Sequence, residues 1–253
     1  MRIAKYSANG NDFVIFHDDS KKERNELARE LCHRQDGIGA DGLIVVVPHE
    51  KYDFEWEFYN SDGSHADMCG NGSRACAHYA YNNDLAPQKM SFLTGAGVIN
   101  AEVSDNSPKE GMVLSELTPP EIIDQAIEYN GKTWWLINTG VPHLICLQDD
   151  VEEFDIEEAR ELRFIYNANV NICSVTEDGN LNVRTYERGV EDETLACGTG
   201  MSACFYRAYL EEKVQNNIEV YPTSKDTLYL GYNGQTITFK GRVKKTFETD
   251  WEI

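Results

Sequence analysis

Short stretches in which apolar side chains alternate with polar ones, or follow one another directly, dominate this chain and predict β-strands. In residues 53–58 the aromatic side chains of Phe54, Trp56 and Phe58 alternate with charged or polar ones, which is typical of a strand with one buried face. Other strands are expected in residues 5–16, 43–47, 89–93, 98–103, 112–117, 134–138, 143–147, 171–175, 181–186 and repeatedly within 218–247. The pair 171–175 and 181–186 predicts a hairpin around Asp178-Gly-Asn180.

Four segments have the spacing of helices. Ser20-Lys-Lys-Glu23 has the form of a capping box and predicts a helix that ends near Arg34. Asp155 is expected to cap another helix. The remaining two begin at Cys69 and Cys197, and they are apolar on most sides, as expected for helices enclosed by sheet.

The same scheme occurs in both halves of the chain and indicates two domains. A length of 253 residues is enough for two modest hydrophobic cores. Thr118-Pro-Pro-Glu121 stands between strand-like runs and is the best linker candidate. We therefore expect an α/β fold of the α+β type, in which each domain wraps a mostly antiparallel set of strands around a central helix.

An eight-residue pattern opens both enclosed helices. Residues 69–76 read CGNGSRAC and residues 197–204 read CGTGMSAC, so the lead cysteines are 197 − 69 = 128 positions apart. A cysteine at a helix N-terminus readily becomes a thiolate, because unpaired backbone N–H groups and the helix dipole favour negative charge there. The following glycines let the backbone approach a ligand, and the exposed amides can hold a carboxylate. Two such starts suggest a matched acid–base pair on one substrate, as a racemase or epimerase needs.

Other interpretations of the repeat stay open at this point. A duplication can preserve packing without chemistry, and two nearby thiols can form a redox pair. A zinc site has little support, because the chain has neither an H-E-x-x-H nor a C-x-x-C sequence. A hydrolase with a single cysteine nucleophile would leave the second Cys-Gly start unexplained. A binding protein without catalytic activity is a further alternative.

Composition narrows the class of protein. With 23 Lys+Arg against 43 Asp+Glu the formal net charge is −20, which argues against a nucleic-acid partner. No apolar run is long enough to span a bilayer, and the N-terminal sequence lacks a signal-peptide core, so we expect a cytoplasmic protein. An odd number of cysteines, seven, argues against a disulfide framework. Five of them are expected as packing residues: Cys32, Cys76, Cys146, Cys173 and Cys204.

Six segments along the chain match the motifs of a known family in order and spacing. They are ANGNDFVIF, DGIGADGLIVV, FYNSDGSHADMCGNG, TGVPH, ANVNI and YERGVEDETLACGTG. Through them nearly the whole chain resembles diaminopimelate epimerases. The resemblance implies cofactor-independent interconversion of LL- and meso-2,6-diaminoheptanedioate by a two-base mechanism, in lysine and peptidoglycan biosynthesis, with no metal. It also implies a homodimer and a final strand that returns to the first domain, giving pseudo-symmetric domains 1–117 plus about 242–253 and 118–241, with the active site in the cleft between them.

The resemblance also assigns roles position by position. Cys69 and Cys197 are expected to be the two acid–base thiols. The helix-start residues expected to hold the reacting carboxylate are Gly70, Asn71, Gly198 and Thr199.

Further positions match residues that contact the rest of the substrate or a thiol. Asn11, Asn60 and Asn169 are expected to contact chiefly its distal amino-acid end. Arg188 can pair with the distal carboxylate, and Glu187 can contact an ammonium group or tune a thiol. The matching histidine, His143, is expected to orient or activate a cysteine.

Several positions depart from the family pattern. Val141 and Gly42 stand where many members have Asn and Gln, and the stretch between Glu187 and Cys197 is one residue longer. Proline and hydroxyproline racemases of the same fold are the alternative within this class. They resemble C-G-H-G at the first cysteine, where this chain has Asn71.

Overall fold

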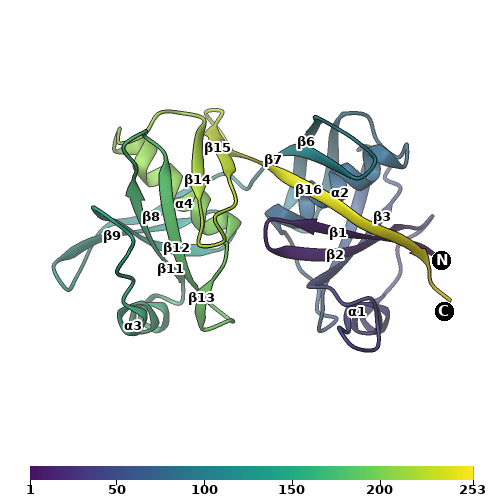
Figure 1. Ribbon diagram of the computed structural model, residues 1–253, viewed down its shortest axis with the longest axis horizontal. Helices are drawn as coiled ribbons and strands as arrows, with labels where there is room; N and C mark the ends of the chain where they lie inside the picture. The colour runs from purple at the N-terminus through teal and green to yellow at the C-terminus, as the bar shows by residue number, and fades with distance from the viewer. Residues whose placement is uncertain (253) are drawn as a thin grey trace. The chain divides into compact units, whose positions relative to one another are not determined.

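The computed structural model describes residues 1–252 and divides into two compact units (Figure 1). Unit 1 comprises Met1–Glu116 and the chain from Lys240 onward, and unit 2 comprises Leu117–Phe239. We retain the boundaries 1–117 plus 242–253 and 118–241 as a proposal for the folding domains.

A closed ring of strands forms unit 1. The strands are β1 (Arg2–Ala8), β2 (Asn11–His17), β3 (Gly42–Val47), β4 (Phe54–Asn60), β5 (Lys89–Thr94), β6 (Gly97–Ser104), β7 (Glu110–Glu116) and β16 (Ile237–Asp250), of which the part from Lys240 onward belongs to this unit. They pair in the order β1-β2-β3-β4-β5-β6-β7-β16, and β16 pairs in turn with β1. Closure leaves this ring without an unpaired edge.

The enclosed helix of unit 1 is α2 (Gly70–Asn82), and it contacts β1, β2, β3, β6 and β7. All its residues from Gly70 to Ala80 are buried, although only a few are large and apolar. A helix surrounded by strands has no solvent-facing side, which explains why the amphipathic pattern is weak here. The prediction of a strand-enclosed helix after the first Cys-Gly is confirmed.

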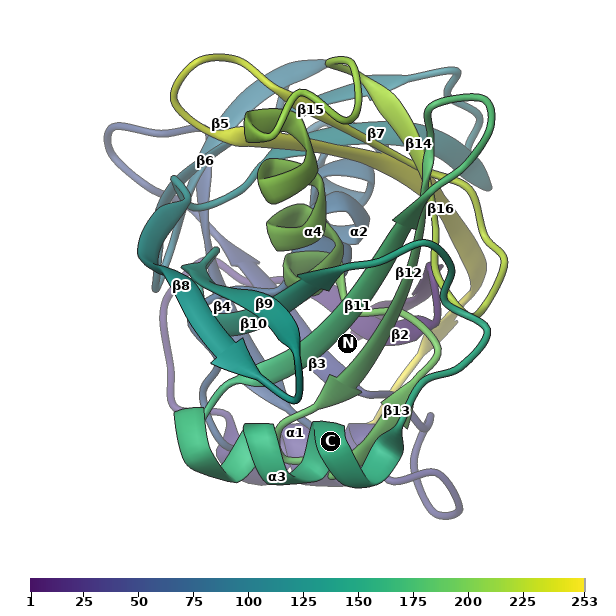
Figure 2. The same cartoon turned by 90° about the vertical axis from the view of Figure 1, so that its left-hand side faces the viewer.

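Unit 2 repeats the arrangement with an open sheet. Its strands are β8 (Glu121–Tyr129), β9 (Lys132–Asn138), β10 (Pro142–Leu147), β11 (Asn169–Val175), β12 (Leu181–Glu187), β13 (Asp192–Thr194), β14 (Ile218–Tyr221) and β15 (Leu228–Tyr232). They pair in the order β15-β14-β12-β11-β10-β9-β8, with β13 on β12. In Figure 2, α4 (Gly198–Leu210) runs among these strands and α3 (Ile156–Tyr166) lies along their outer side.

The strand pairs are mainly antiparallel, as expected, and the parallel ones are β2–β3, β4–β5, β10–β11 and β12–β14. The predicted hairpin of β11 and β12 is present. This topology confirms the α+β fold class. The exposed strand β8 and the short strand β13 were not predicted. Five of the nine residues of β8 are polar or charged and most of the strand is exposed, so its alternation is weak.

A two-residue turn between β1 and β2 fixes the approach to the first Cys-Gly start. Asn9 and Gly10 both have positive φ, 45° and 94°, and the flanking pair is Ala8 with Asn11. Asn-Gly is the preferred sequence for such a type I′ hairpin, because both positions require φ above zero. The turn leaves Asn9 and Asn11 beside the beginning of α2.

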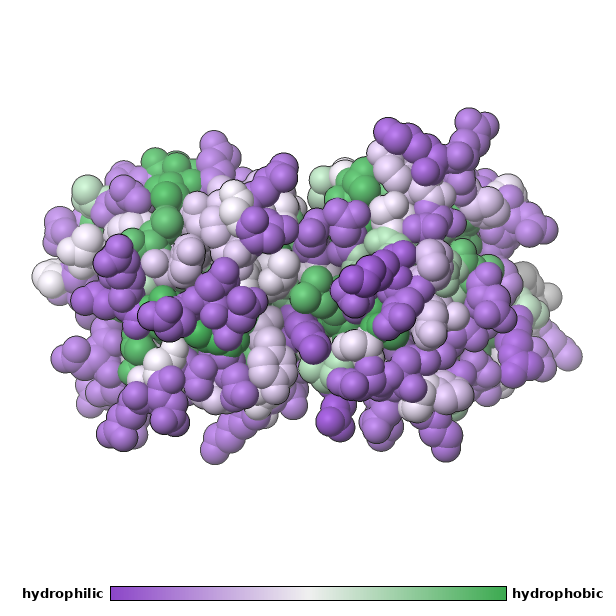
Figure 3. Space-filling model, turned by 90° about the horizontal axis from the view of Figure 1, so that it is seen from above, coloured by the Kyte–Doolittle hydropathy of each residue, from purple (hydrophilic) through white to green (hydrophobic). Residues whose placement is uncertain are grey.

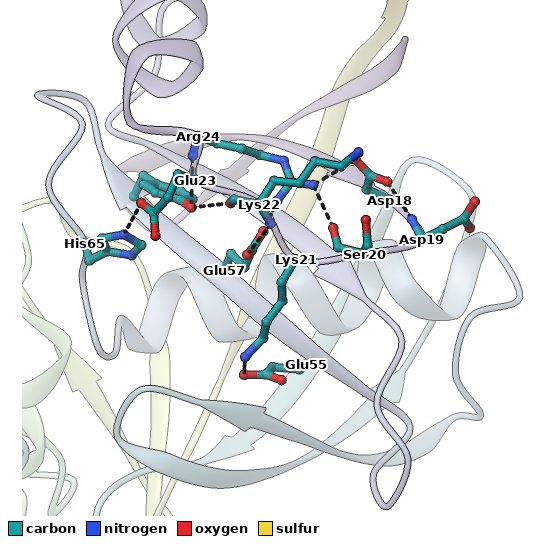
Figure 4. Close-up of polar contacts among 11 residues, drawn as sticks. Asp18, Asp19, Ser20, Lys21, Lys22, Glu23, Arg24, Glu55, Glu57 and His65 are labelled. Atoms are coloured by element: carbon teal, nitrogen blue, oxygen red, sulfur yellow. Dashed lines mark hydrogen bonds and ion pairs between the residues drawn. The ribbon is translucent and has the colours of Figure 1, made fainter.

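The predicted start of the first helix at Ser20 is wrong. Helix α1 (Asn25–Cys32) begins five residues later, and Arg24 occupies its N-cap without a side-chain cap bond. Lys21 pairs with Glu55 and Arg24 with Glu57, both on β4, as Figure 4 shows. These ion pairs, and a bond from the backbone of Lys22 to Glu57 at 3.1 Å, hold residues 21–24 along β4 instead of in a helical turn.

The five cysteines predicted to pack in the interior do so. Each has at most 2% of its surface exposed: Cys32, Cys76, Cys146, Cys173 and Cys204. Hydrophilic side chains cover most of the face seen in Figure 3, with apolar groups scattered between them. That distribution agrees with the chain's large excess of acidic residues.

The structure distinguishes a cap that stabilises a helix from one that does not. Asp155 Oδ1 accepts bonds from the backbone N–H groups of Glu157 and Glu158, both at 3.0 Å. Asp155→Ala is therefore expected to lower the free energy of unfolding by about 1 kcal/mol. Ser20→Ala, at the predicted cap that starts no helix, is the control and should change it by less than about 0.5 kcal/mol. Urea denaturation measures both, and equal losses would contradict this account.

Candidate active site

Cys69 is the N-cap residue of α2, as predicted. Its backbone is extended, with φ −147° and ψ 118°, and its Sγ accepts a bond from the N–H of Gly72 at 3.4 Å. The residue is half-buried. Bonding to a first-turn amide favours the charged form of the sulfur, because the thiolate is the stronger acceptor.

Cys197 is the N-cap residue of α4 in the same way. Its backbone is also extended, with φ −122° and ψ 108°, and 9% of the residue is exposed. Its side chain does not cap the first turn as that of Cys69 does; Sγ lies 3.6 Å from Oγ1 of Thr199. The two lead cysteines thus share one position on their helices but differ in the group beside the sulfur.

In unit 1 the structure brings Asn11 and Asn71 together at the start of α2. Asn71 Nδ2 donates to Oδ1 of Asn11 at 2.8 Å, and Asn11 Nδ2 donates to Oδ2 of Asp41 at 3.1 Å. Asp41 Oδ2 also accepts from the backbone N–H of Asp12 at 3.0 Å. An ionised carboxylate has acceptor atoms and no donor, so Asp41 has to receive the N–H of Asn11. This fixes the orientation of the Asn11 amide and, through it, that of Asn71.

Sequence reasoning missed a buried cation in this group. The Arg74 side chain donates to the carbonyl of Gly70 at 3.1 Å, to Oδ1 of Asn9 at 2.8 Å and to Oδ1 of Asn71 at 2.5 Å. Arg74 is completely buried, and burial lowers its pKa to about 9, while the nearby Cys69 opposes the shift. The available signal was a charged residue inside a helix start that is otherwise small and neutral.

In unit 2 a chain of hydrogen bonds leads from Cys197 to His143. His143 Nε2 lies 2.9 Å from Oγ1 of Thr199, and Nδ1 lies 3.1 Å from Nδ2 of Asn171. The Asn171 amide is itself oriented, because its Oδ1 accepts from Thr185 Oγ1 at 2.8 Å. Asn171 and Thr185 were not predicted as site residues, although Asn171 lies in one of the family motifs.

This network determines the tautomer of His143. Asn171 donates to Nδ1, so the ring proton is on Nε2 and is donated to Oγ1 of Thr199. The hydroxyl of Thr199 can then donate toward Sγ of Cys197. Burial lowers the pKa of His143 to about 3, so the ring is neutral at pH 7. It orients the threonine as a neutral donor and carries no positive charge.

Three residues of unit 2 that are expected to contact the distal end of the substrate lie close together: Asn169, Glu187 and Arg188. Asn169 Oδ1 accepts from the backbone N–H of Arg188 at 2.8 Å, and Arg188 NH1 donates to the carbonyl of Asn167 at 2.9 Å. Within residues 1–252 no carboxylate forms an ion pair with Arg188, whose charge lowers the pKa of His143 slightly further. Burial raises the pKa of Glu187.

Asn60 is not part of the group at the start of α2. It is exposed at the end of β4, and its Nδ2 donates to Oγ of Ser64 at 3.0 Å within the following turn. Gly42 is paired with Asn60, and a side chain at Gly42 would come within 2.6 Å of the ring of Phe58. A glutamine therefore cannot occupy this position without movement of its neighbours.

In the described part of the chain, no group of three or more His, Cys, Asp and Glu residues is arranged to hold a metal ion. None of its helices has the length and apolar composition needed to cross a membrane.

Comparison with a solved structure identifies the class of fold. A phenazine biosynthesis protein of the PhzF family from Enterococcus faecalis matches with a TM-score of 0.75, covering 100% of this chain and 99% of that one. At 14% identity this likeness concerns the fold alone. The class is thus a two-unit α+β protein in which strands enclose a cysteine-capped helix in each unit.

The family follows from the sequence comparisons. The diaminopimelate epimerase family model matches residues 3–123 and 135–229. The diaminopimelate epimerase of a Nitratiruptor species is 59% identical over 249 residues, 98% of each chain. That of Campylobacter lari is 55% identical over 253 residues, 100% of each. The chain belongs to the diaminopimelate epimerase family.

The buried neutral histidine predicts a pH dependence of stability. The pKa of His143 is about 3 in the folded chain and about 6.5 when unfolded, so the unfolded state binds more protons between these values. This contribution is complete above pH 6.5 and is lost as the pH falls, by about 2 kcal/mol between pH 7 and pH 5. Urea denaturation at both pH values should show a smaller loss for His143→Gln than for the unmodified protein. The exposed His65 provides the control, His65→Gln, which should behave like the unmodified protein.

Proposed function

We propose that this chain interconverts LL- and meso-2,6-diaminoheptanedioate without a cofactor, with Cys69 and Cys197 as the two acid–base groups. One observation carries the proposal: the lead cysteine of each repeated octapeptide occupies the N-cap position of a strand-enclosed helix of the same length, 13 residues. The family membership supports the substrate, since the relatives that match along their whole length are named diaminopimelate epimerases.

The chemistry requires one thiolate and one thiol. The thiolate takes the proton from the substrate α-carbon on one face, and the bonding electrons remain on the substrate as a carbanion. The thiol on the other face then gives its proton to the same carbon, which leaves the configuration inverted and that second sulfur as the thiolate. Protons and charge balance, and the reverse reaction uses the same groups in exchanged roles.

The helix starts supply the stabilisation that this carbanion needs. The donors proposed for the reacting carboxylate are the first-turn backbone amides at Gly70, Asn71, Gly198 and Thr199. Amides at a helix N-terminus favour an anion, and charge developing on the carboxylate in the carbanion strengthens the same bonds. The same donors would thus bind the substrate carboxylate and stabilise the carbanion that forms during the reaction.

The distal amino-acid end has candidate partners of both charges. Arg188 can form a bidentate ion pair with the distal carboxylate of the substrate. Glu187 can form an ion pair with an ammonium group. Neutral hydrogen bonds to the substrate are proposed for Asn11, Asn60 and Asn169. Burial raises the pKa of Glu187, and an ammonium group bound beside the carboxylate would favour its charged form. The proposal includes a homodimer in the cytoplasm, supported by the family resemblance and the biosynthetic role.

Isotope incorporation tests the reaction directly. Purified, reduced protein is incubated with LL-diaminopimelate in deuterated water with no added cofactor. We expect meso product that carries deuterium at one α-carbon, because the proton returned comes from a thiol that exchanges with solvent. Absence of both product and exchange, with the thiols titrated as reduced, would contradict the proposal. Proline and hydroxyproline, assayed in parallel, test the alternative racemase activity.

Replacement of either lead cysteine tests the two-base route. Cys69→Ala and Cys197→Ala are each expected to lower epimerisation by about 10²- to 10⁴-fold or more, because each removes one proton-transfer group. Cys76→Ala and Cys204→Ala, at the last position of each octapeptide, are the matched controls and should retain most activity. A lead-cysteine variant with near-normal turnover would exclude the two-base mechanism.

The distal-carboxylate role of Arg188 makes a further prediction. Arg188→Met should raise KM for diaminopimelate by about 10- to 100-fold, the equivalent of one charge-assisted bidentate pair. Arg160→Met on α3 removes an exposed guanidinium of the same unit and should leave KM unchanged. Steady-state kinetics decide the matter, and an unchanged KM in the Arg188 variant would remove this residue from the binding site.

A further inference from the structure

The two octapeptides differ most in chemical character at their sixth position. Arg74 and Ser202 each stand five residues after the lead cysteine. Both are fully buried, and both bond the carbonyl of the first helical residue: Arg74 to Gly70 at 3.1 Å and Ser202 to Gly198 at 2.8 Å. The repeat therefore contains its own comparison, in which one helix start holds a cation and the other holds a neutral hydroxyl.

Arg74 lies close to the start of α2, where a positive charge opposes the helix dipole. A side chain on a helix leans toward the N-terminus, and the bonds to Gly70, Asn71 and Asn9 hold its guanidinium there. Each of these three bonds ends on a neutral oxygen. Burying a cation at the positive end of a helix costs free energy, which a negative charge nearby would offset.

Cys69 is the group whose ionisation this charge affects. It interacts electrostatically with Arg74, and its sulfur already accepts a bond from the N–H of Gly72 at 3.4 Å. Both influences favour the thiolate over the thiol. At the second start the sulfur of Cys197 faces the hydroxyl of Thr199, which is oriented by a neutral His143.

We propose that Arg74 is a positioning residue that holds Cys69 as the thiolate in the ligand-free protein, while Cys197 rests as the thiol. Arg74 acts through Cys69 and does not itself touch the reacting carbon. This inference deepens the proposed function, on which its catalytic meaning rests: one thiolate and one thiol are the required pair, and Arg74 determines which sulfur begins as the base. The α-hydrogen facing Cys69 is then the one that the resting protein removes.

Thiol alkylation measures this without any assay of epimerisation. The unmodified, ligand-free protein is treated with iodoacetamide over a range of pH, and tandem mass spectrometry follows Cys69 and Cys197 separately. Only thiolates react, so the midpoint of each rate profile gives the pKa of that thiol. We expect the midpoint of Cys69 to lie below that of Cys197. Equal midpoints, or the reverse order, would overturn the proposal.

Variants then test whether the guanidinium of Arg74 is what favours the thiolate form of Cys69. Arg74→Met should slow alkylation of Cys69 at neutral pH by about tenfold, corresponding to one pKa unit, and leave Cys197 unchanged. Arg74→Lys keeps the charge and should restore most of the rate. Ser202→Ala, at the matched position of the second octapeptide, is the control and should leave both profiles unchanged. Identical Cys69 profiles in the Met variant and the unmodified protein would show that the guanidinium does not set the ionisation.

The alkylation result and the deuterium experiment fail independently. If Cys69 shows the lower midpoint but no diaminopimelate is epimerised, the ionisation inference stands and the assigned reaction is wrong. If diaminopimelate is epimerised while the two midpoints are equal, the reaction stands and the role of Arg74 is excluded. Comparison in the unmodified protein needs no variant, so a poorly folded Arg74→Met protein would not prevent a decision.

Discussion

A helix enclosed by strands has to satisfy the unpaired N–H groups of its first turn from whatever lies at its start. In both units of this chain the residue there is a cysteine in an extended conformation, followed by a helix of 13 residues. A thiolate is a suitable partner for such amides, and a substrate carboxylate is another. The enclosure therefore does more than bury a core: it places a cysteine at the N-cap of the enclosed helix in each unit.

The two enclosed helices begin with the same N-cap residue, but different side chains surround that cysteine in each unit. In unit 1 a buried guanidinium, Arg74, and two linked asparagines surround the helix start. In unit 2 a neutral imidazole, His143, bonds the hydroxyl of Thr199, which lies next to the sulfur of Cys197. An acid–base pair needs unequal ionisation at any moment, since two thiolates cannot donate and two thiols cannot accept the substrate proton. Different surroundings for two equivalent cysteines are a direct way to obtain that inequality.

Local patterns predicted most of the fold. Alternation located the buried strands, and the doubled Cys-Gly pattern located both enclosed helices with their first residues. The errors lie where tertiary contacts decide: carboxylates of β4 displace the start of α1 to Asn25, and the edge strand β8 has little alternation because most of it is exposed. Single-residue roles were accessible mainly through the family motifs. The positions of Arg74 and Asn171 depend on partners distant in the sequence, so only the structure reveals their contacts.

The second glycine of each octapeptide also has a different purpose from the one its sequence suggests. A side chain at Gly200 would come within 2.3 Å of Oδ1 of Asn171, the residue that orients His143. At Gly72 it would lie 3.3 Å from Cβ of Cys69 and 3.4 Å from the side chain of Ile44. These glycines face neighbouring protein atoms, so they let the surrounding residues approach the helix start closely. The shared glycines of the two octapeptides thus allow close packing of the residues around each helix start.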